Sequence, residues 1–241
     1  MSDARFARRR REGTWHRFRP YVYSALALAL AGVLVWLVWF STVLSVRQVN
    51  VEGEQTLKES LISTRAKVTR GAPLARVDTV SIEARVGVLE RVESVAVERH
   101  WPKTITIRIV ERKAVAWIRS GGAIRGLDRF GVDFRTYSKA PKGLFEVRVN
   151  ALSNEKRQDS LVEAAKVIGA IRSGDRSLFE KITVVTVASK DSVELILTKN
   201  RTVRWGSAAQ STQKLTVLES LLKISARTYD VSAPAQPTTK E

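Results

Sequence analysis

A run of 26 residues without a charged side chain constrains this chain more than any other feature. It extends from Tyr21 to Val46 and reads YVYSALALALAGVLVWLVWFSTVLSV. A helix rises about 1.5 Å per residue, so roughly 20 apolar residues span the hydrocarbon core of a bilayer. Tyrosines near one end, with Trp36 and Trp39 toward the other, are typical of side chains at the headgroup level. The run predicts a transmembrane helix over residues 21–45.

The two flanks of this run differ in charge. Residues 1–20 form an Arg-rich tail with seven arginines, opposed only by Asp3 and Glu12. Because positive charge is retained in the cytoplasm, we expect the N-terminus inside and residues 47–241 outside. This is the topology of a single-pass type II protein of the plasma membrane.

Two alternatives to a membrane anchor fit the run less well. A cleaved signal peptide usually has an apolar region of about 7–15 residues with its cleavage site after that region. Here the A-x-A triplets lie in the first half of the run, between Ala25 and Gly32. A buried core helix of a soluble protein does not need so long an uncharged stretch.

The chain is strongly basic, with 41 Lys and Arg against 24 Asp and Glu. Most of this excess follows the predicted anchor, where no nucleic acid is expected as a partner. Anionic lipid headgroups of the membrane, or anionic cell-wall polymers, fit a basic extracytoplasmic surface better. A solvated basic surface without a partner is the alternative. The absence of cysteine excludes disulfides, thiolate metal sites and cysteine nucleophiles.

Residues 46–112 predict a small β-α-α-β-β domain. Alternating valines near residue 50 indicate a strand, and two helical apolar patterns follow, the second with Asp78 as N-cap. A hairpin then turns at Trp101–Lys103 and returns through Ile105, Ile107 and Ile109. Two helices can cover one face of a three-stranded sheet.

Residues 113–233 predict a second domain of mixed α/β type on a mostly antiparallel sheet, so the fold class is α+β. The expected strands are 114–118, 143–149, 181–187, 192–198 and 202–206, with a hairpin turning at Asp128–Gly131. Helices are expected at 154–172 and 208–224. The final residues, 234–241, predict a flexible tail, because Pro234 and Pro237 lack the amide hydrogens that a strand ladder needs.

The sequence contains no convincing catalytic or metal constellation. The two histidines, His16 and His100, lie on opposite sides of the predicted membrane helix and cannot cooperate. Strand parity places His100 with Glu98 on the polar face of a hairpin. No cluster of His and carboxylates has metal-ligand spacing, and no glycine-rich turn precedes a helix as in a phosphate loop. We therefore expect no enzyme activity, no metal and no cofactor.

If the chain performs no chemistry, its function lies on binding surfaces. The last predicted strand is expected to be a sheet edge, and an unpaired edge can accept an extended segment of a partner. We expect Tyr229 and Val231 to contribute specificity. The alternative is that this strand is paired internally or blunted by the prolines after it. The predicted partner-binding residues are Arg227, Thr228, Tyr229, Asp230, Val231, Ser232 and Ala233.

Several motifs together resemble the FtsQ/DivIB family of bacterial cell-division proteins. They are VNVEG after the anchor, VESVAVERHWPKTITIRIVERKAVAW, the hairpin LDRFGVDF, then VRWGSAAQSTQKLTVLESLL and YDVSAPAQPTT. The resemblance covers residues 20–238. The positions that carry the family pattern as structural residues are Arg99, Trp101, Pro102, Glu111, Arg112, Gly206 and Lys214.

The resemblance implies a POTRA domain at 46–112 and an FtsQ-type β-domain after it. It implies an essential scaffold of the division machinery, enriched at the septum. Such a scaffold binds the coiled-coil proteins FtsB (DivIC) and FtsL and helps regulate the septal peptidoglycan synthase FtsW/FtsI. In the family, the closing strand receives FtsB by strand addition. A POTRA-bearing chaperone of membrane-protein export and a cell-wall hydrolase or transferase are the alternative functions.

Overall fold

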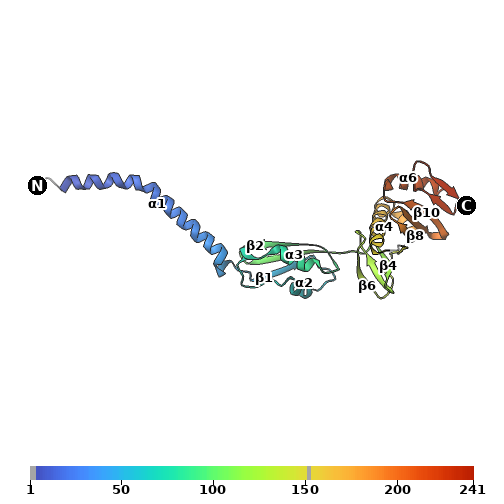
Figure 1. Ribbon diagram of the computed structural model, residues 1–241, viewed down its shortest axis with the longest axis horizontal. Helices are drawn as coiled ribbons and strands as arrows, with labels where there is room; N and C mark the ends of the chain where they lie inside the picture. The colour runs from blue at the N-terminus through green and yellow to red at the C-terminus, as the bar shows by residue number, and fades with distance from the viewer. Residues whose placement is uncertain (1–3, 151–152) are drawn as a thin grey trace. The chain divides into compact units, whose positions relative to one another are not determined.

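The computed structural model describes residues 4–150 and 153–241, so the first three residues of the predicted Arg-rich tail lie outside the described residues. The chain divides into two compact units, Met1–Glu111 and Arg112–Glu241. Figure 1 shows the elements of each unit coloured along the chain. Both units combine helices with sheets, which confirms the predicted α+β class.

The first unit begins with the helix α1, Ala4–Phe40. Within the described residues, Arg19–Phe40 is the one helical segment long and apolar enough to cross a membrane. The predicted helix over 21–45 is wrong at its C-terminal end. α1 stops at Phe40, and a 3-10 helix η1 (Thr42–Leu44) follows. The uncharged run continues past the end of α1 because its last residue, Val46, is fully buried in the core of the next domain.

The POTRA-like domain has the predicted order of elements. They are β1 (Gln48–Glu52), α2 (Glu59–Ala66), the 3-10 helix η2 (Leu74–Arg76), α3 (Thr79–Gly87), β2 (Val92–His100) and β3 (Thr104–Glu111). β3 lies in the middle of the sheet, parallel to β1 and antiparallel to β2. The predicted N-cap is present: Asp78 accepts a hydrogen bond from the Ser81 amide at 3.0 Å.

The second unit is built on one sheet in the order β12-β11-β10-β9-β8-β7-β4-β5-β6. The strands are β4 (Ala116–Ser120), β5 (Ala123–Leu127), β6 (Asp133–Tyr137), β7 (Glu146–Val149), β8 (Ile182–Ser189), β9 (Ser192–Leu197), β10 (Arg201–Gly206), β11 (Thr228–Asp230) and β12 (Thr238–Lys240). Antiparallel pairs outnumber parallel ones, as the sequence predicts.

Helices α4 (Asn154–Gly174), α5 (Arg176–Lys181) and α6 (Ser211–Leu221) complete this unit. α4 buries its predicted apolar stripe, which includes Leu161 and Ile168, in the core formed with the sheet. The pattern did not predict α5, a six-residue helix that Asp175 caps through the Leu178 amide at 2.9 Å. A 3-10 turn, η3 (Thr198–Asn200), joins β9 to β10.

Candidate partner-binding edge

β11 carries most of the predicted binding residues, and it is an interior strand. On one side it pairs in parallel with β10, with Val203 opposite Tyr229. On the other side it pairs antiparallel with β12, with Thr239 opposite Tyr229. The prediction that this segment is the sheet edge is therefore wrong. The internally paired alternative is what the structure contains.

The correction has a simple cause. Pro234 and Pro237 lie in the turn between the two strands, and the Gln236 amide donates to the Ala233 carbonyl across that turn at 2.9 Å. Neither proline occupies a ladder position, so their missing amides cost no strand hydrogen bond. The segment 234–241, predicted as a flexible tail, thus returns as β12.

Tyr229 and Val231 cannot supply specificity to a partner, because both side chains are fully buried in the core of the second unit. The Tyr229 hydroxyl donates to the Ile224 carbonyl at 2.8 Å and accepts from the Ala226 amide at 3.2 Å. These bonds fix the segment between α6 and β11. The two residues hold the edge in place and do not form its surface.

The other predicted residues remain accessible in different degrees. Arg227, Ser232 and Ala233 are exposed, whereas Thr228 and Asp230 are half-buried. The Asp230 carboxylate accepts from the Ser232 amide at 3.0 Å and from the Ser232 hydroxyl at 2.6 Å. This local turn directs the chain away from β11 and toward β12.

β12 forms one edge of the sheet, and β6 forms the other. All three side chains of β12 are exposed, and among the described strands none lies beyond it in the sheet order. Its contact with the rest of the unit is the short pairing with β11, supported by a bond from the Arg227 amide to the Lys240 carbonyl at 3.0 Å. The edge is short and polar and contains Lys240, features that limit uncontrolled strand pairing. The sequence did not predict this strand, because two prolines precede it and it is only three residues long.

Two residues of the family pattern support β10, which lies two strands in from this edge. Gly206 ends β10 with a positive φ of 74°, and a Cβ atom there would lie 3.0 Å from the Cβ of Ser232. Lys214 on α6 is buried and donates to the carbonyls of Trp205 at 2.9 Å and Ser207 at 2.8 Å. Burial lowers the pKa of Lys214, and the Glu163 charge opposes that shift. Both residues brace the end of β10.

Glu111 is the most heavily bonded pattern residue of the first unit. One carboxylate oxygen accepts from the amides of Gln55 at 2.7 Å, Thr56 at 2.8 Å and Leu57 at 2.8 Å. The other accepts from the Thr56 hydroxyl. Burial alone would raise the pKa of Glu111, but these hydrogen bonds outweigh it and lower the pKa to about 2. Glu111 is thus an anionic clamp that holds the loop between β1 and α2.

The remaining pattern residues are structural too. Arg112 pairs with Asp128, whose buried carboxylate also accepts from the amides of Phe130 at 2.9 Å and Val132 at 2.8 Å in the β5–β6 turn. Arg99 donates to the Val77 carbonyl at 2.6 Å. Trp101 and Pro102 form the exposed β2–β3 turn through a cis peptide bond.

His100 has no catalytic surroundings. Its ring lies 3.2 Å from Glu98, and both side chains are exposed on β2, as strand parity predicted. The described residues contain no group of three or more His, Cys, Asp or Glu side chains that could hold a metal ion. Within the part of the chain that the structure describes, the sheet edge remains the strongest candidate for function.

Comparison with known proteins shows which family the chain resembles. Residues 44–112 match the family described as "POTRA domain, FtsQ-type". The chain is 36% identical over 241 residues to "Cell division protein FtsQ" of Streptomyces venezuelae, covering 94% of this chain and 88% of the relative. It is 38% identical over 205 residues to the protein of the same name from Streptomyces griseus, covering 82% of this chain and 97% of the relative. It is 34% identical to the protein of the same name from Streptomyces bingchenggensis, over an alignment that covers 92% of this chain and 86% of the relative.

Proposed function

Because this chain belongs to the FtsQ family of cell division proteins, we propose that it is a non-enzymatic scaffold that binds a partner strand at β12. The domain limits proposed with it are the tail, the anchor, a POTRA domain at 46–112 and an FtsQ-type β-domain from 113. The observation that carries the proposal is that β12 is an edge strand whose three side chains are all exposed.

The partner chemistry follows from the geometry of the edge. A strand edge offers a row of main-chain donors and acceptors, which an extended segment of another protein can pair. The three β12 side chains are exposed, and Arg227 and Ser232 are exposed on the adjoining β11 segment. They are polar or cationic, so they favour a segment with polar or acidic side chains at facing positions. An FtsB (DivIC)-like protein is the proposed donor of that segment, with FtsL bound alongside it.

The proposed mechanism is recruitment and restraint. α1 anchors the scaffold in the plasma membrane with the N-terminus in the cytoplasm, and the two folded units lie outside. By holding the FtsB- and FtsL-like proteins at the septum, the scaffold helps to regulate septal peptidoglycan synthesis by FtsW and FtsI. What supports the orientation is the arginine-rich composition before α1.

The experiment measures binding of the FtsB-like partner by full-length protein in detergent. A Thr238→Pro/Thr239→Pro double variant removes two β12 amides, one for each side of the strand, because alternate amides point in opposite directions. We expect binding to weaken about two- to tenfold, since the one outward main-chain bond is worth about 0.5–1.5 kcal/mol. The matched control is Thr136→Pro on β6, the opposite edge of the same sheet. Unchanged binding by the double variant, with the fold retained, would refute strand addition at β12.

A further inference from the structure

The POTRA-like domain is joined to the membrane helix by a very short connection. α1 ends at Phe40, and Val46 is already fully buried in the domain. The Val46 amide donates to the Ala72 carbonyl at 2.9 Å, and the Gly71 amide donates to the Val46 carbonyl at 2.8 Å. An extended chain advances at most about 3.6 Å per residue, so the connecting residues span no more than about 18 Å. One end of this domain is therefore tied close to the bilayer, whichever side of the membrane it occupies.

The strand register identifies which segments share that end. Gln48 lies opposite Thr104 in the parallel pair, so the starts of β1 and β3 are neighbours. The Arg47 amide donates to the Lys103 carbonyl at 2.9 Å, which brings the β2–β3 turn to the same place. We call residues 45–47, 67–78 and 99–104 the anchor end. Residues 52–59, 86–93 and 109–111 form the distal end.

The two ends have opposite charge. The cations of the anchor end are Arg47, Lys67, Arg70, Arg76, Arg99 and Lys103, and its one carboxylate is Asp78. The anions of the distal end are Glu52, Glu54, Glu59, Glu90, Glu93 and Glu111, and its cations are Lys58 and Arg91. An anionic surface near the anchor would attract the first end and repel the second.

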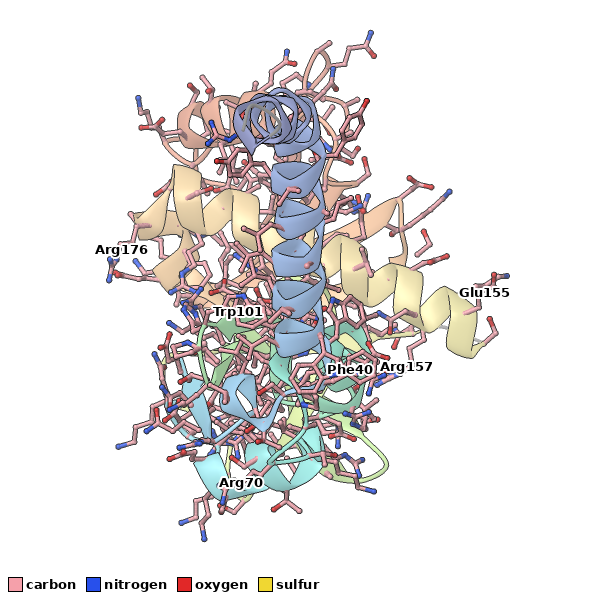
Figure 2. All side chains as sticks on the ribbon, turned by 90° about the vertical axis from the view of Figure 1, so that its left-hand side faces the viewer. Phe40, Arg70, Trp101, Glu155, Arg157 and Arg176 are labelled. Atoms are coloured by element: carbon pink, nitrogen blue, oxygen red, sulfur yellow. The ribbon has the colours of Figure 1, made fainter. Side chains whose placement is uncertain are left out.

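The anchor end also carries an exposed aromatic side chain. Trp101 is 52% exposed at the tip of the β2–β3 turn. Figure 2 labels it and Arg70 on the domain. An indole ring with cations beside it is the combination that settles at lipid headgroups.

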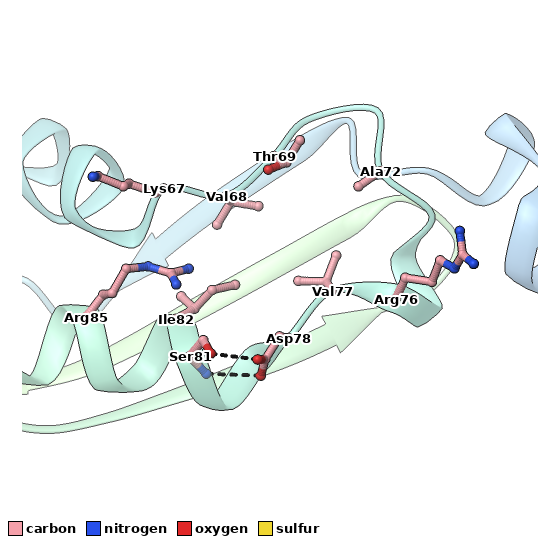
Figure 3. A pocket seen from close by; sticks show the side chains of 10 residues that line it. All are labelled: Lys67, Val68, Thr69, Ala72, Arg76, Val77, Asp78, Ser81, Ile82 and Arg85. Atoms are coloured by element: carbon pink, nitrogen blue, oxygen red, sulfur yellow. Dashed lines mark hydrogen bonds between the residues drawn. The ribbon is translucent and has the colours of Figure 1, made fainter.

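A pocket of 360 Å³ opens between α2, η2 and α3 at this end, lined by Lys67 and Arg76 among others (Figure 3). Asp78 also lines this pocket, where its carboxylate accepts from the Ser81 amide at 3.0 Å and the Ser81 hydroxyl at 2.6 Å and keeps its negative charge. Arg85, farther in, donates to the Ala66 carbonyl at 3.0 and 2.8 Å. The Arg76 guanidinium lies over the Phe40 ring at the end of α1, 4.8 Å from the ring centroid, so this cation stands beside the anchor itself.

We propose that the anchor end binds anionic lipid headgroups of the bilayer that α1 spans. The short connection gives these headgroups a high local concentration, and the cations and Trp101 supply the attraction. The acidic distal end orients the domain by repulsion. The inference does not depend on partner binding at β12, because it concerns a different unit of the chain.

The test uses full-length protein in nanodiscs of phosphatidylcholine alone or with phosphatidylglycerol. The chain has no cysteine, so single labels can be placed at will. A nitroxide at Thr69→Cys reports the anchor end, and one at Ser60→Cys on α2, next to the distal end, is the matched control; both positions are exposed. We expect the Thr69 label to be shielded from a water-soluble relaxation agent only in the anionic discs. The Ser60 label should stay accessible in both.

Charge variants give the decisive comparison. Each cation near an anionic membrane is worth about fivefold in binding. Arg47→Gln, Arg70→Gln and Lys103→Gln together should therefore lower the ratio of lipid-bound to lipid-free POTRA-like domain about 100-fold. The control, Lys139→Gln, Lys142→Gln and Lys190→Gln, removes the same charge from the second unit and should change nothing. Equal shielding in both kinds of disc, or equal loss in both triple variants, would overturn the proposal. Partner binding by the first triple variant should be normal, which separates this result from the scaffold proposal.

Discussion

β11 and β12 are adjacent strands of the same sheet with three residues each, yet their surroundings are opposite. β11 is paired on both sides, and Tyr229 at its centre is fully buried. β12 is paired on one side, and all its side chains are exposed. The difference separates stability from binding: the inner strand should govern unfolding, and the outer strand should govern association. Substitutions can test whether the two properties are divided in this way.

Tyr229→Ala should have the largest effect on stability. It removes a buried ring and leaves the Ile224 carbonyl and Ala226 amide without their partner. We expect a loss of about 3–5 kcal/mol in the free energy of unfolding, measured by urea denaturation of the full chain. Thr239→Ala on β12 is the control and should cost under about 0.5 kcal/mol. Similar losses for both variants would remove the distinction between the strands.

Lys214→Ala should have the next largest effect on stability, because it removes the side chain that supports the end of β10. The change leaves the carbonyls of Trp205 and Ser207 unsatisfied in the core. We expect a loss of about 2–4 kcal/mol. Lys214→Arg, which keeps the charge and donors, should lose less. A thermal melt that is unchanged in the alanine variant would show that the buried amine is not a brace.

Glu111→Gln tests whether the edge is independent of the first unit. The folded pKa of about 2 lies below the ordinary value of 4.5. The carboxylate therefore stabilises the fold fully above pH 4.5, and this stabilisation is lost as pH falls toward 2. The size is about 3 kcal/mol. The glutamine variant should unfold more easily at pH 7 and show a flatter profile between pH 5 and 2, while partner binding stays normal.

His100→Ala should have the smallest effect. The side chain is exposed, and its ring lies 3.2 Å from the equally exposed Glu98. Surface changes of this kind alter stability by about 0.5 kcal/mol or less. Complementation of a depleted strain should therefore be complete. Failure to complement, with a normal melting temperature, would reopen the enzyme hypothesis.

The sequence predicted the elements whose pattern is strong. The isoleucines of β3, the Asp78 cap, the α4 stripe and the hairpin at Asp128 are where periodicity and capping placed them. Each is set by local chemistry, in which a cap or an alternating face needs no information from distant residues.

The predictions that were wrong failed for a different physical reason. The end of α1 was predicted too late because apolar residues serve a membrane span and a protein core equally, and Val46 belongs to the core. β12 was missed because its pairing with β11 depends on a turn that brings Thr239 back beside Tyr229. The candidate site was accordingly placed one strand too far inward. Sequence alone could locate the region, whereas the exposed strand required the sheet order.

Photocrosslinking in dividing cells tests the central claim most directly. A benzoyl-phenylalanine at Thr239 on β12 and one at Thr136 on β6 sample the two edges of the same sheet. The account predicts that Thr239 traps an FtsB-like chain and that Thr136 does not. Trapping of that chain from Thr136 alone, or from neither position, would contradict the assignment of β12 as the binding edge.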